Sequence, residues 1–110
     1  SAQSAALARS QVDQQRLLLE QRKQAIIQAV ETFWHTHRSA KVAMTSSREA
    51  VVATEEAVRD AQLRYRAGIA PVTELLLAQR DLQAARSAEA TAIQQWNLSR
   101  AGLELETGRQ

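Results

Sequence analysis

The stretch LRYRAGIAPVTELLLAQRDL, residues 63–82, holds the only proline of the chain and one of its three glycines. Long helix-forming segments lie on either side of it. Gly68 can adopt the left-handed conformation that closes a helix in a Schellman motif, because it has no Cβ, and Ile69 would then cover Leu63. Pro71 cannot continue a helix, since it has no N–H and its ring crowds the preceding turn. We therefore expect the first helix to end before Gly68.

A second helix is expected to begin within a few residues of this stop. Thr73 has a side-chain oxygen that can cap the free N–H groups of a new helix, and Glu74 places negative charge at its positive end. Val72 and Leu77 have the spacing of a hydrophobic staple around that cap. A turn this short makes two helices antiparallel. The fold class predicted is all-α, an antiparallel coiled-coil helical hairpin.

The two arms of this hairpin are expected to differ in length. Alanine, leucine, glutamine, glutamate and arginine dominate the sequence, and almost nothing in residues 1–67 breaks a helix. This composition predicts a long helix of about 65 residues over 1–67, a tip turn over 68–72 and a short helix of about 34 residues over 73–107. Residues 1–110 then form a single hairpin. Because the chain starts inside a helical pattern, we expect it to be a fragment of a longer protein.

Apolar residues recur at every seventh position along the first arm. One such row consists of Ala5, Val12, Leu19, Ile26, Phe33 and Ala40, and a second of Met44, Val51, Val58 and Tyr65. The shift of four between the two rows predicts a stutter near residues 40–44, where the supercoil would unwind. A face of small residues, Ala50, Ala53, Ala57 and Ala61, is expected to let the second helix approach closely.

The second arm carries two apolar rows. The row expected to face the first arm is formed by Leu75, Leu82, Trp96 and Leu103, with Ala78, Ala85 and Ala92 three residues further on. The other row is Leu77, Ala84, Thr91, Leu98 and Leu105. A helix with two apolar rows contacts more than one neighbour.

Folding the chain back about Ala70 predicts which residues meet across the hairpin. Leu82 is placed near Val58, Trp96 near Met44 and Leu103 near His37, because both helices rise by the same 1.5 Å per residue. The row Val12, Leu19, Ile26 and Phe33 then has no partner in this chain. We expect this row of four residues either to mediate self-association of the fragment or to fray in isolation.

The charge of the chain favours neither nucleic acid nor a membrane-spanning role. The net charge of +2 results from 14 basic and 12 acidic residues spread along the sequence. Nucleic acid is therefore not an expected partner. No run approaches the roughly 18 apolar residues that a spanning helix needs. The absence of cysteine fits a periplasmic or a cytosolic protein.

No residue pattern predicts catalysis, a cofactor or a metal site. His35 and His37 point about 200° apart on a helix, so they cannot share a metal, and Glu31 would add at most one further ligand. There is no cysteine nucleophile and no glycine-rich phosphate loop, so the protein is not expected to be an enzyme. Trp34 and Trp96 lie on heptad rows and are expected in the core.

The charged residues of the hairpin have a plain interpretation and a functional one. Glu55 with Arg59 and Asp60 with Arg64 have the spacing of ordinary surface ion pairs. The tip residues Arg64, Tyr65, Arg66, Glu74, Arg80 and Asp81 could likewise be a polar hairpin end. Ile69 with Ala70, expected to be exposed and surrounded by arginines, would alternatively form a docking surface, because aromatic residues and arginine are strong interface anchors.

Several of these motifs resemble the hairpin of the TolC-like outer-membrane efflux protein family. At the tip they are Tyr65-x-x-Gly68, Glu74-Leu75-Leu76 and Ala78-Gln79-Arg80-x-Leu82-x-x-Ala85. Upstream, Val30-Glu31-x-Phe33-Trp34 is similar to the family's Val-Glu-x-aromatic stretch, and Leu103-Glu104-x-x-x-Gly108 to its helix end. The resemblance covers essentially the whole chain.

The resemblance implies a periplasmic portion of an outer-membrane protein. Three full-length copies would form a twelve-helix tunnel, a passive duct for efflux or type I secretion that an inner-membrane transporter feeds. The tip would dock with a periplasmic adaptor protein through Tyr65, Gly68, Ile69 and Ala70. The entrance iris would involve Arg64, Arg66, Glu74, Arg80 and Asp81.

Two points stay open. Some family members narrow the entrance with a ring of aspartates, and Leu77 occupies the corresponding position here. The chain could alternatively be the hairpin of a periplasmic adaptor, or a structural coiled-coil interaction module. Adaptor and scaffold hairpins usually have arms of matched length, so the unequal arms predicted here favour the duct.

Overall fold

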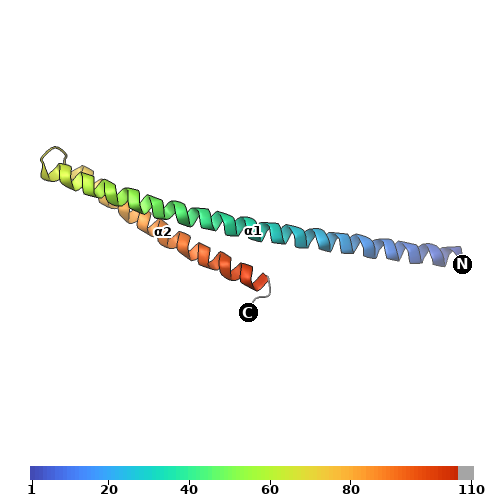
Figure 1. Cartoon of the computed structure of the whole chain (residues 1–110). Helices are drawn as coiled ribbons and strands as arrows, with labels where there is room; N and C mark the ends of the chain where they lie inside the picture. The colour runs from blue at the N-terminus through green and yellow to red at the C-terminus, as the bar shows by residue number, and fades with distance from the viewer. Residues whose placement is uncertain (107–110) are drawn as a thin grey trace. The chain divides into compact units, whose positions relative to one another are not determined.

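The computed structural model describes the backbone of residues 1–106 and the side chains of residues 1–102. It consists of two helices, α1 from Ala2 to Arg66 and α2 from Val72 to Glu106 (Figure 1). The predicted helical hairpin is confirmed, with 65 residues in α1 and 35 in α2. The chain divides into two units, Ser1–Trp34 and a second that starts at His35. Each unit is described by itself.

The first unit is a single exposed helical segment. The Ser1 hydroxyl accepts a hydrogen bond from the backbone N–H of Ser4 at 3.2 Å, and so caps the first turn. Every residue from 1 to 32 is exposed, including Val12, Leu19 and Ile26 of the predicted apolar row. Phe33, the last residue of that row, is half-buried.

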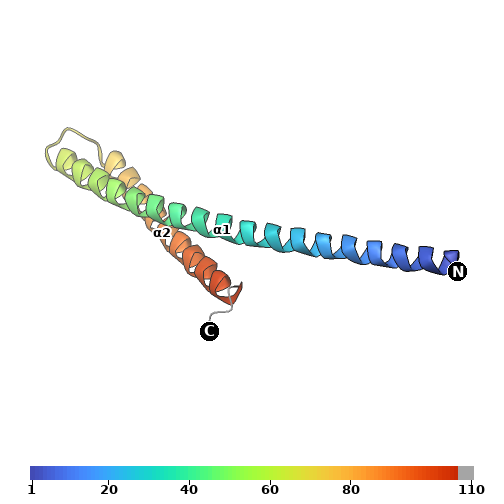
Figure 2. The same cartoon turned by 45° about the vertical axis from the view of Figure 1, so that its right-hand side comes forward.

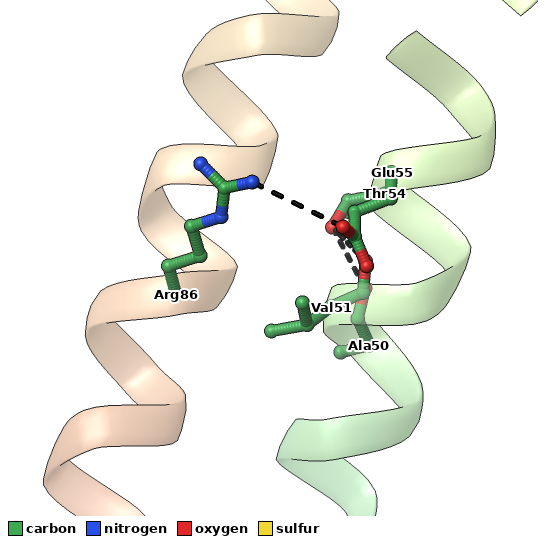
Figure 3. Close-up of polar contacts among 5 residues, drawn as sticks. All are labelled: Ala50, Val51, Thr54, Glu55 and Arg86. Atoms are coloured by element: carbon green, nitrogen blue, oxygen red, sulfur yellow. Dashed lines mark hydrogen bonds and ion pairs between the residues drawn. The ribbon is translucent and has the colours of Figure 1, made fainter. Parts of the chain in front are cut away.

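The second unit is an antiparallel pair of helices. α2 lies alongside the green part of α1 in both views (Figures 1 and 2). Among the described side chains, two ion pairs cross between the helices: Arg64 with Glu74 at 3.0 Å, and Glu55 with Arg86 at 4.0 Å, of which Figure 3 shows the second. Residue numbers rise along α1 as they fall along α2 in these pairs, which is the pattern of antiparallel helices.

The seam on α1 follows a single uninterrupted heptad. Its half-buried or buried residues form one row of His37, Met44, Val51 and Val58 and a second row of Ala40, Ser47, Thr54 and Ala61. Steps of three and four residues alternate along the seam, as in a regular coiled coil. The predicted stutter is therefore wrong. Ala40 and Met44 belong to the two neighbouring rows of the same heptad, and each row continues past the other.

The predicted face of small residues is also wrong in its membership. Ala50, Ala53 and Ala57 are exposed, whereas Ala61 is buried with 7% of its surface accessible. Ala61 lies seven residues after Thr54 and so belongs to the seam. The other three fall beside the seam, on rows that turn toward solvent.

The seam on α2 agrees with its predicted row. Its half-buried residues are Leu75, Leu82, Glu89 and Trp96, with Ala78, Ala85, Ala92 and Ser99 three residues further on. The second predicted row is solvent-exposed at Leu77, Ala84, Thr91 and Leu98. Leu103 and Leu105 lie outside the described side chains.

Hydroxyl groups in the seam are satisfied within their own helices. Thr54 Oγ1 donates to the carbonyl oxygens of Ala50 at 2.8 Å and Val51 at 3.0 Å (Figure 3). Ser47 and Ser99 likewise donate at 2.8 Å to carbonyls three residues earlier. Such bonds let a polar side chain occupy a half-buried position without a partner on the facing helix.

Trp96 forms a ring contact that the sequence did not predict. Its ring centroid lies 4.7 Å from that of His37, with the two planes inclined by 34°. His37 was expected near Leu103, one heptad further along α2. The predicted proximity of Trp96 to Met44 stays a prediction.

The turn is a Schellman motif, as predicted. Gly68 has φ of 75°, the Ile69 N–H donates to the Arg64 carbonyl at 3.0 Å, and the Gly68 N–H donates to the Tyr65 carbonyl at 3.0 Å. These are the two bonds that define the motif. The expected cover of Leu63 by Ile69 is not formed, because the two side chains remain 64% and 70% exposed.

α2 begins one residue earlier than predicted. Val72 is its first residue, and the Glu74 N–H donates to the Pro71 carbonyl at 3.1 Å, so Pro71 rather than Thr73 stands at the cap. The staple positions then fall on Ala70 and Leu75. Ala70 is only 7% exposed, whereas Val72 and Leu77 are 45% and 56% exposed.

We predict that Gly68→Ala lowers the free energy of unfolding by about 1 kcal/mol, because an L-residue is strained at this positive φ. Nothing lies within 4 Å of the added Cβ, so crowding contributes nothing. Gly68→Asn is the matched comparison and should lose less, since asparagine tolerates this conformation. Thermal unfolding followed by circular dichroism measures both. Equal stability of Gly68→Ala and the parent chain would contradict the backbone argument.

A second prediction concerns the seam. Ala61→Leu should destabilise the hairpin by about 1–3 kcal/mol, because it forces a large side chain between closely packed helices. Ala57→Leu, four residues away and exposed, should change stability by no more than about 0.5 kcal/mol. Urea unfolding of both variants checks this. A similar loss in both would restore the small-residue face predicted from sequence.

Candidate docking surface at the hairpin tip

The tip of the hairpin exposes apolar side chains around a rigid turn. Ile69 is the most exposed of them at 70%. The tip surface consists of Leu63, Tyr65, Ile69, Val72, Leu76 and Leu77, all between 45% and 70% exposed. The Schellman hydrogen bonds and the buried Ala70 hold the turn from beneath. A fixed, apolar, convex end of this kind can bind a partner without first losing loop entropy.

Ala70 is the one predicted docking residue that cannot contact a partner in this conformation. The expectation that it is exposed beside Ile69 is wrong. Ala70 directly precedes the cap of α2, and only 7% of its surface is accessible. Tyr65, Gly68 and Ile69 are exposed, as a docking role would require.

One ion pair joins the two sides of the tip. Arg64 Nη1 donates to Glu74 Oε2 at 3.0 Å, with the two side chains 44% and 45% exposed. This contact replaces the predicted pair of Arg64 with Asp60. It places two of the predicted gating residues in direct contact across the turn.

The other predicted gating residues are exposed but are not joined to this pair. Arg66 ends α1. Leu77, Arg80 and Asp81 lie along α2, where Asp81 is nine residues, or roughly 13 Å, beyond the first residue of the helix. Among the side chains that the structure describes, none of these four takes part in an ion pair. Their role at an entrance stays a prediction.

Other predicted surface pairs form differently. Glu55 contacts Arg86 on the facing helix instead of Arg59, and Arg59 contacts Glu56 at 3.7 Å. Both Glu55 and Arg86 lie on rows that flank the seam, so they face each other once the helices pair. Spacing along one helix could not reveal this.

The sequence prediction missed three members of the tip surface. The turn was expected to cover Leu63, the staple to include Val72, and a family-like motif to include Leu76. None of the three was expected on the surface. Their positions off the two seam rows were the available signal. An apolar residue off the seam must either meet another partner or remain in water.

The remaining chemistry of the described residues is sparse. No group of three or more histidine, cysteine, aspartate or glutamate residues within residues 1–106 could hold a metal ion. His35 is exposed while His37 is half-buried against Trp96, so the two rings do point apart. Neither helix, over the part described, is long and apolar enough to cross a bilayer.

Comparison with known proteins identifies no related protein. No family model, no curated protein and no solved structure matches the chain.

We predict that the Arg64–Glu74 contact is worth about 0.2–1 kcal/mol, because the pair is partly exposed. A double-mutant cycle with Arg64→Ala and Glu74→Ala measures this coupling in chemical unfolding. The coupling should fall as sodium chloride is raised from about 0.05 M to 1 M, where the Debye length shortens to about 3 Å.

Arg66→Ala is the matched control for this cycle. Arg66 lies two residues from Arg64 and forms no ion pair with any side chain of residues 1–102, so its coupling with Glu74→Ala should be near zero. Equal coupling for Arg64 and Arg66 would mean that Glu74 acts only through the general positive field of the tip.

Proposed function

We propose that this chain is the periplasmic hairpin of an outer-membrane efflux or type I secretion duct, and that its tip docks with a periplasmic adaptor. In the full-length protein the hairpin belongs to a homotrimer and sits in the wall of a passive channel near its entrance. The inner-membrane transporter acts on it indirectly, through the adaptor. The proposal requires no enzyme activity, metal or cofactor, and no nucleic acid.

The observation that carries this proposal is the exposed apolar tip on a rigid turn. A hairpin end that served only to reverse the chain would be expected to expose polar residues. Here Ile69 projects with 70% of its surface accessible, directly after a glycine held at positive φ. The tip motifs that resemble the TolC-like family coincide with this surface.

The unequal helices support the same assignment. α1 has 65 residues and α2 has 35. A hairpin from an adaptor or a scaffold would pair its arms along their whole length. The long arm of a duct hairpin instead serves more than one neighbour, which accounts for the exposed apolar residues of α1.

The gate is the least constrained part of the proposal. Leu77 is 56% exposed at the position where an aspartate ring would lie, and Asp81 follows one turn later. Three copies of Leu77 would narrow the entrance by an apolar contact. In each of the three copies, the Arg64–Glu74 pair would instead hold the two helices of that hairpin together at the tip.

Two other functions remain as alternatives. An adaptor hairpin would use the same tip, and a structural coiled-coil module would use the seam and the exposed rows of both helices. Flanking sequence distinguishes them. Amphipathic β-strands of about ten residues beside the hairpin would support the duct, and soluble domains there would support a scaffold.

We predict that Ile69→Asp in the full-length protein abolishes export while the trimer remains intact. A carboxylate at the centre of an apolar contact loses its hydration on docking, and this cost is several kcal/mol unless a cation meets it. Export of a fluorescent substrate from cells and crosslinking of the trimer measure the two effects. Gly68→Pro should give the same result, because proline cannot adopt φ of 75°.

Ser46→Asp is the matched control, since Ser46 is an exposed polar residue of α1, off the seam and distant in sequence from the tip. Export should persist in this variant. Unimpaired export in both Ile69→Asp and Gly68→Pro would show that the tip is only a turn.

A further inference from the structure

The seam between α1 and α2 has two flanks, and one ion pair identifies each of them. Glu55 meets Arg86 on one flank (Figure 3), and Arg64 meets Glu74 on the other. In antiparallel coiled helices, positions on either side of the seam face their counterparts on the other helix in this way. We call the flank of Glu55 and Arg86 the basic flank.

The basic flank comprises the positions one and four residues after each member of two seam rows. These rows run from His37 to Tyr65 on α1 and from Leu75 to Trp96 on α2. Of the nine cations in residues 35–102, seven lie at these positions: Arg38, Lys41, Arg48, Arg59, Arg66, Arg86 and Arg100. Of the seven acids in the same range, only Glu55 does. Charges that are spread along the sequence are therefore segregated once the two helices pair.

Most of these cations do not stabilise the hairpin. Among the side chains of residues 1–102, five of them form no ion pair: Arg38, Lys41, Arg48, Arg66 and Arg100. Lys41 precedes Glu55 by fourteen residues, and Arg100 follows Arg86 by the same number, so Lys41 and Arg100 lie at one level of the flank as like charges. Such positions ordinarily carry opposite charges that join the two helices. The basic flank therefore carries charge that the hairpin itself does not use.

We infer that the basic flank binds an acidic amphipathic helix of a partner protein, which lies along the seam as a third helix of the coiled coil. The cations stand on both sides of the seam, with Lys41 and Arg48 on α1 and Arg86 and Arg100 on α2. A helix with an apolar row between two rows of glutamate would meet cations on both of its edges. Charges that flank a coiled-coil seam determine which helices associate.

The basic flank also offers apolar contact to such a helix. Val52 is 58% exposed, and Ile93 is half-buried midway between Arg86 and Arg100. The aliphatic stems of the arginines add apolar surface beside them while their charged ends reach the carboxylates.

The shape of the basic flank favours a helix over other anions. On α1 the cations extend from Arg38 to Arg66, a straight distance of roughly 42 Å. A helix lying alongside can follow this row over its whole length. The phosphates of duplex nucleic acid wind around their axis, so a straight row would meet them only at crossings. A single small anion cannot bridge cations that stand seven residues, or roughly 10 Å, apart.

This inference does not rest on the function proposed for the tip, and the 110-residue chain is sufficient to test it. The probe is a labelled synthetic peptide of about four heptads, with leucine in the inner rows and glutamate in both flanking rows. Fluorescence anisotropy should show binding that weakens as sodium chloride is raised. The same peptide with lysine in place of glutamate should not bind. Failure of the glutamate peptide to bind at up to about 1 mM chain overturns the inference.

Paired variants test whether the basic flank is the binding surface. Arg48→Gln combined with Arg100→Gln should weaken binding of the peptide by about tenfold, because two partly exposed ion pairs are lost. Ser46→Glu combined with Gln94→Glu is the matched control, since it changes the net charge equally at exposed positions off this flank. The control should change affinity by less than about threefold. Equal losses in both double variants would mean that only net charge matters, and would overturn the inference.

Lys41→Glu separates binding from stability. It places a carboxylate at the level of Arg100, so the urea midpoint of the hairpin should rise while binding of the peptide weakens severalfold. Unchanged binding in this stabilised variant would contradict a role of the flank.

Two further measurements distinguish other occupants. Poly-L-glutamate, which is not helical at neutral pH, and duplex DNA should each bind at least about tenfold more weakly than the helical peptide. Equal binding of either would show recognition of charge without shape and overturn the inference. Sedimentation equilibrium of the chain alone tests for a second copy. Self-association that is lost in the double variant of Arg48 and Arg100 would identify that copy as the occupant, in place of an acidic partner.

Discussion

The left-handed turn at Gly68 is the constraint on which the hairpin depends. Without it α1 would continue, since the residues on both sides have strong helix propensity. Two backbone hydrogen bonds close the turn, and Pro71 then stands at the N-terminal cap of α2. All the contacts between the helices follow from this reversal: the ion pairs of Arg64 with Glu74 and of Glu55 with Arg86, and the ring pair of His37 with Trp96.

Much of this fold could be predicted because its signals are local. Glycine at positive φ and proline at the start of a helix follow from the covalent structure of those residues. The α2 seam was also predictable, because its row of leucine and tryptophan has a row of alanines three residues further on, whereas the competing row that begins at Leu77 has mostly polar residues there. The residue at the N-terminal cap of α2 was less predictable. Thr73 is the stronger capping residue in general, yet the carbonyl of Pro71 receives the first hydrogen bond and moves the helix start by one residue.

What could not be predicted concerns contacts between the helices. Two apolar rows that differ by four residues can be a stutter or the two halves of one heptad, and the sequence of one helix does not distinguish them. The structure shows one continuous heptad, because the seam includes the half-buried residues His37, Ser47 and Thr54, although none of the three is apolar. The burial of Ala70 could not be predicted for the same reason, because it depends on how closely the ends of the two helices approach. At the candidate site, the exposed apolar tip was recognised at Ile69 but not at Val72 or Leu76.

The hydroxyl groups of Ser47, Thr54 and Ser99 bond to their own helices, and the α2 seam alternates larger side chains such as Leu82 with alanines. Among the side chains that the structure describes, no hydrogen bond crosses the middle of the seam, and the ion pair of Glu55 with Arg86 is 4.0 Å long and partly exposed. Axial position is set at the two ends by the turn and by the rings of His37 and Trp96, and between them by the alternating seam rows, which interlock as in a coiled coil. A load applied at the tip would therefore be shared between the two helices along the length of their contact.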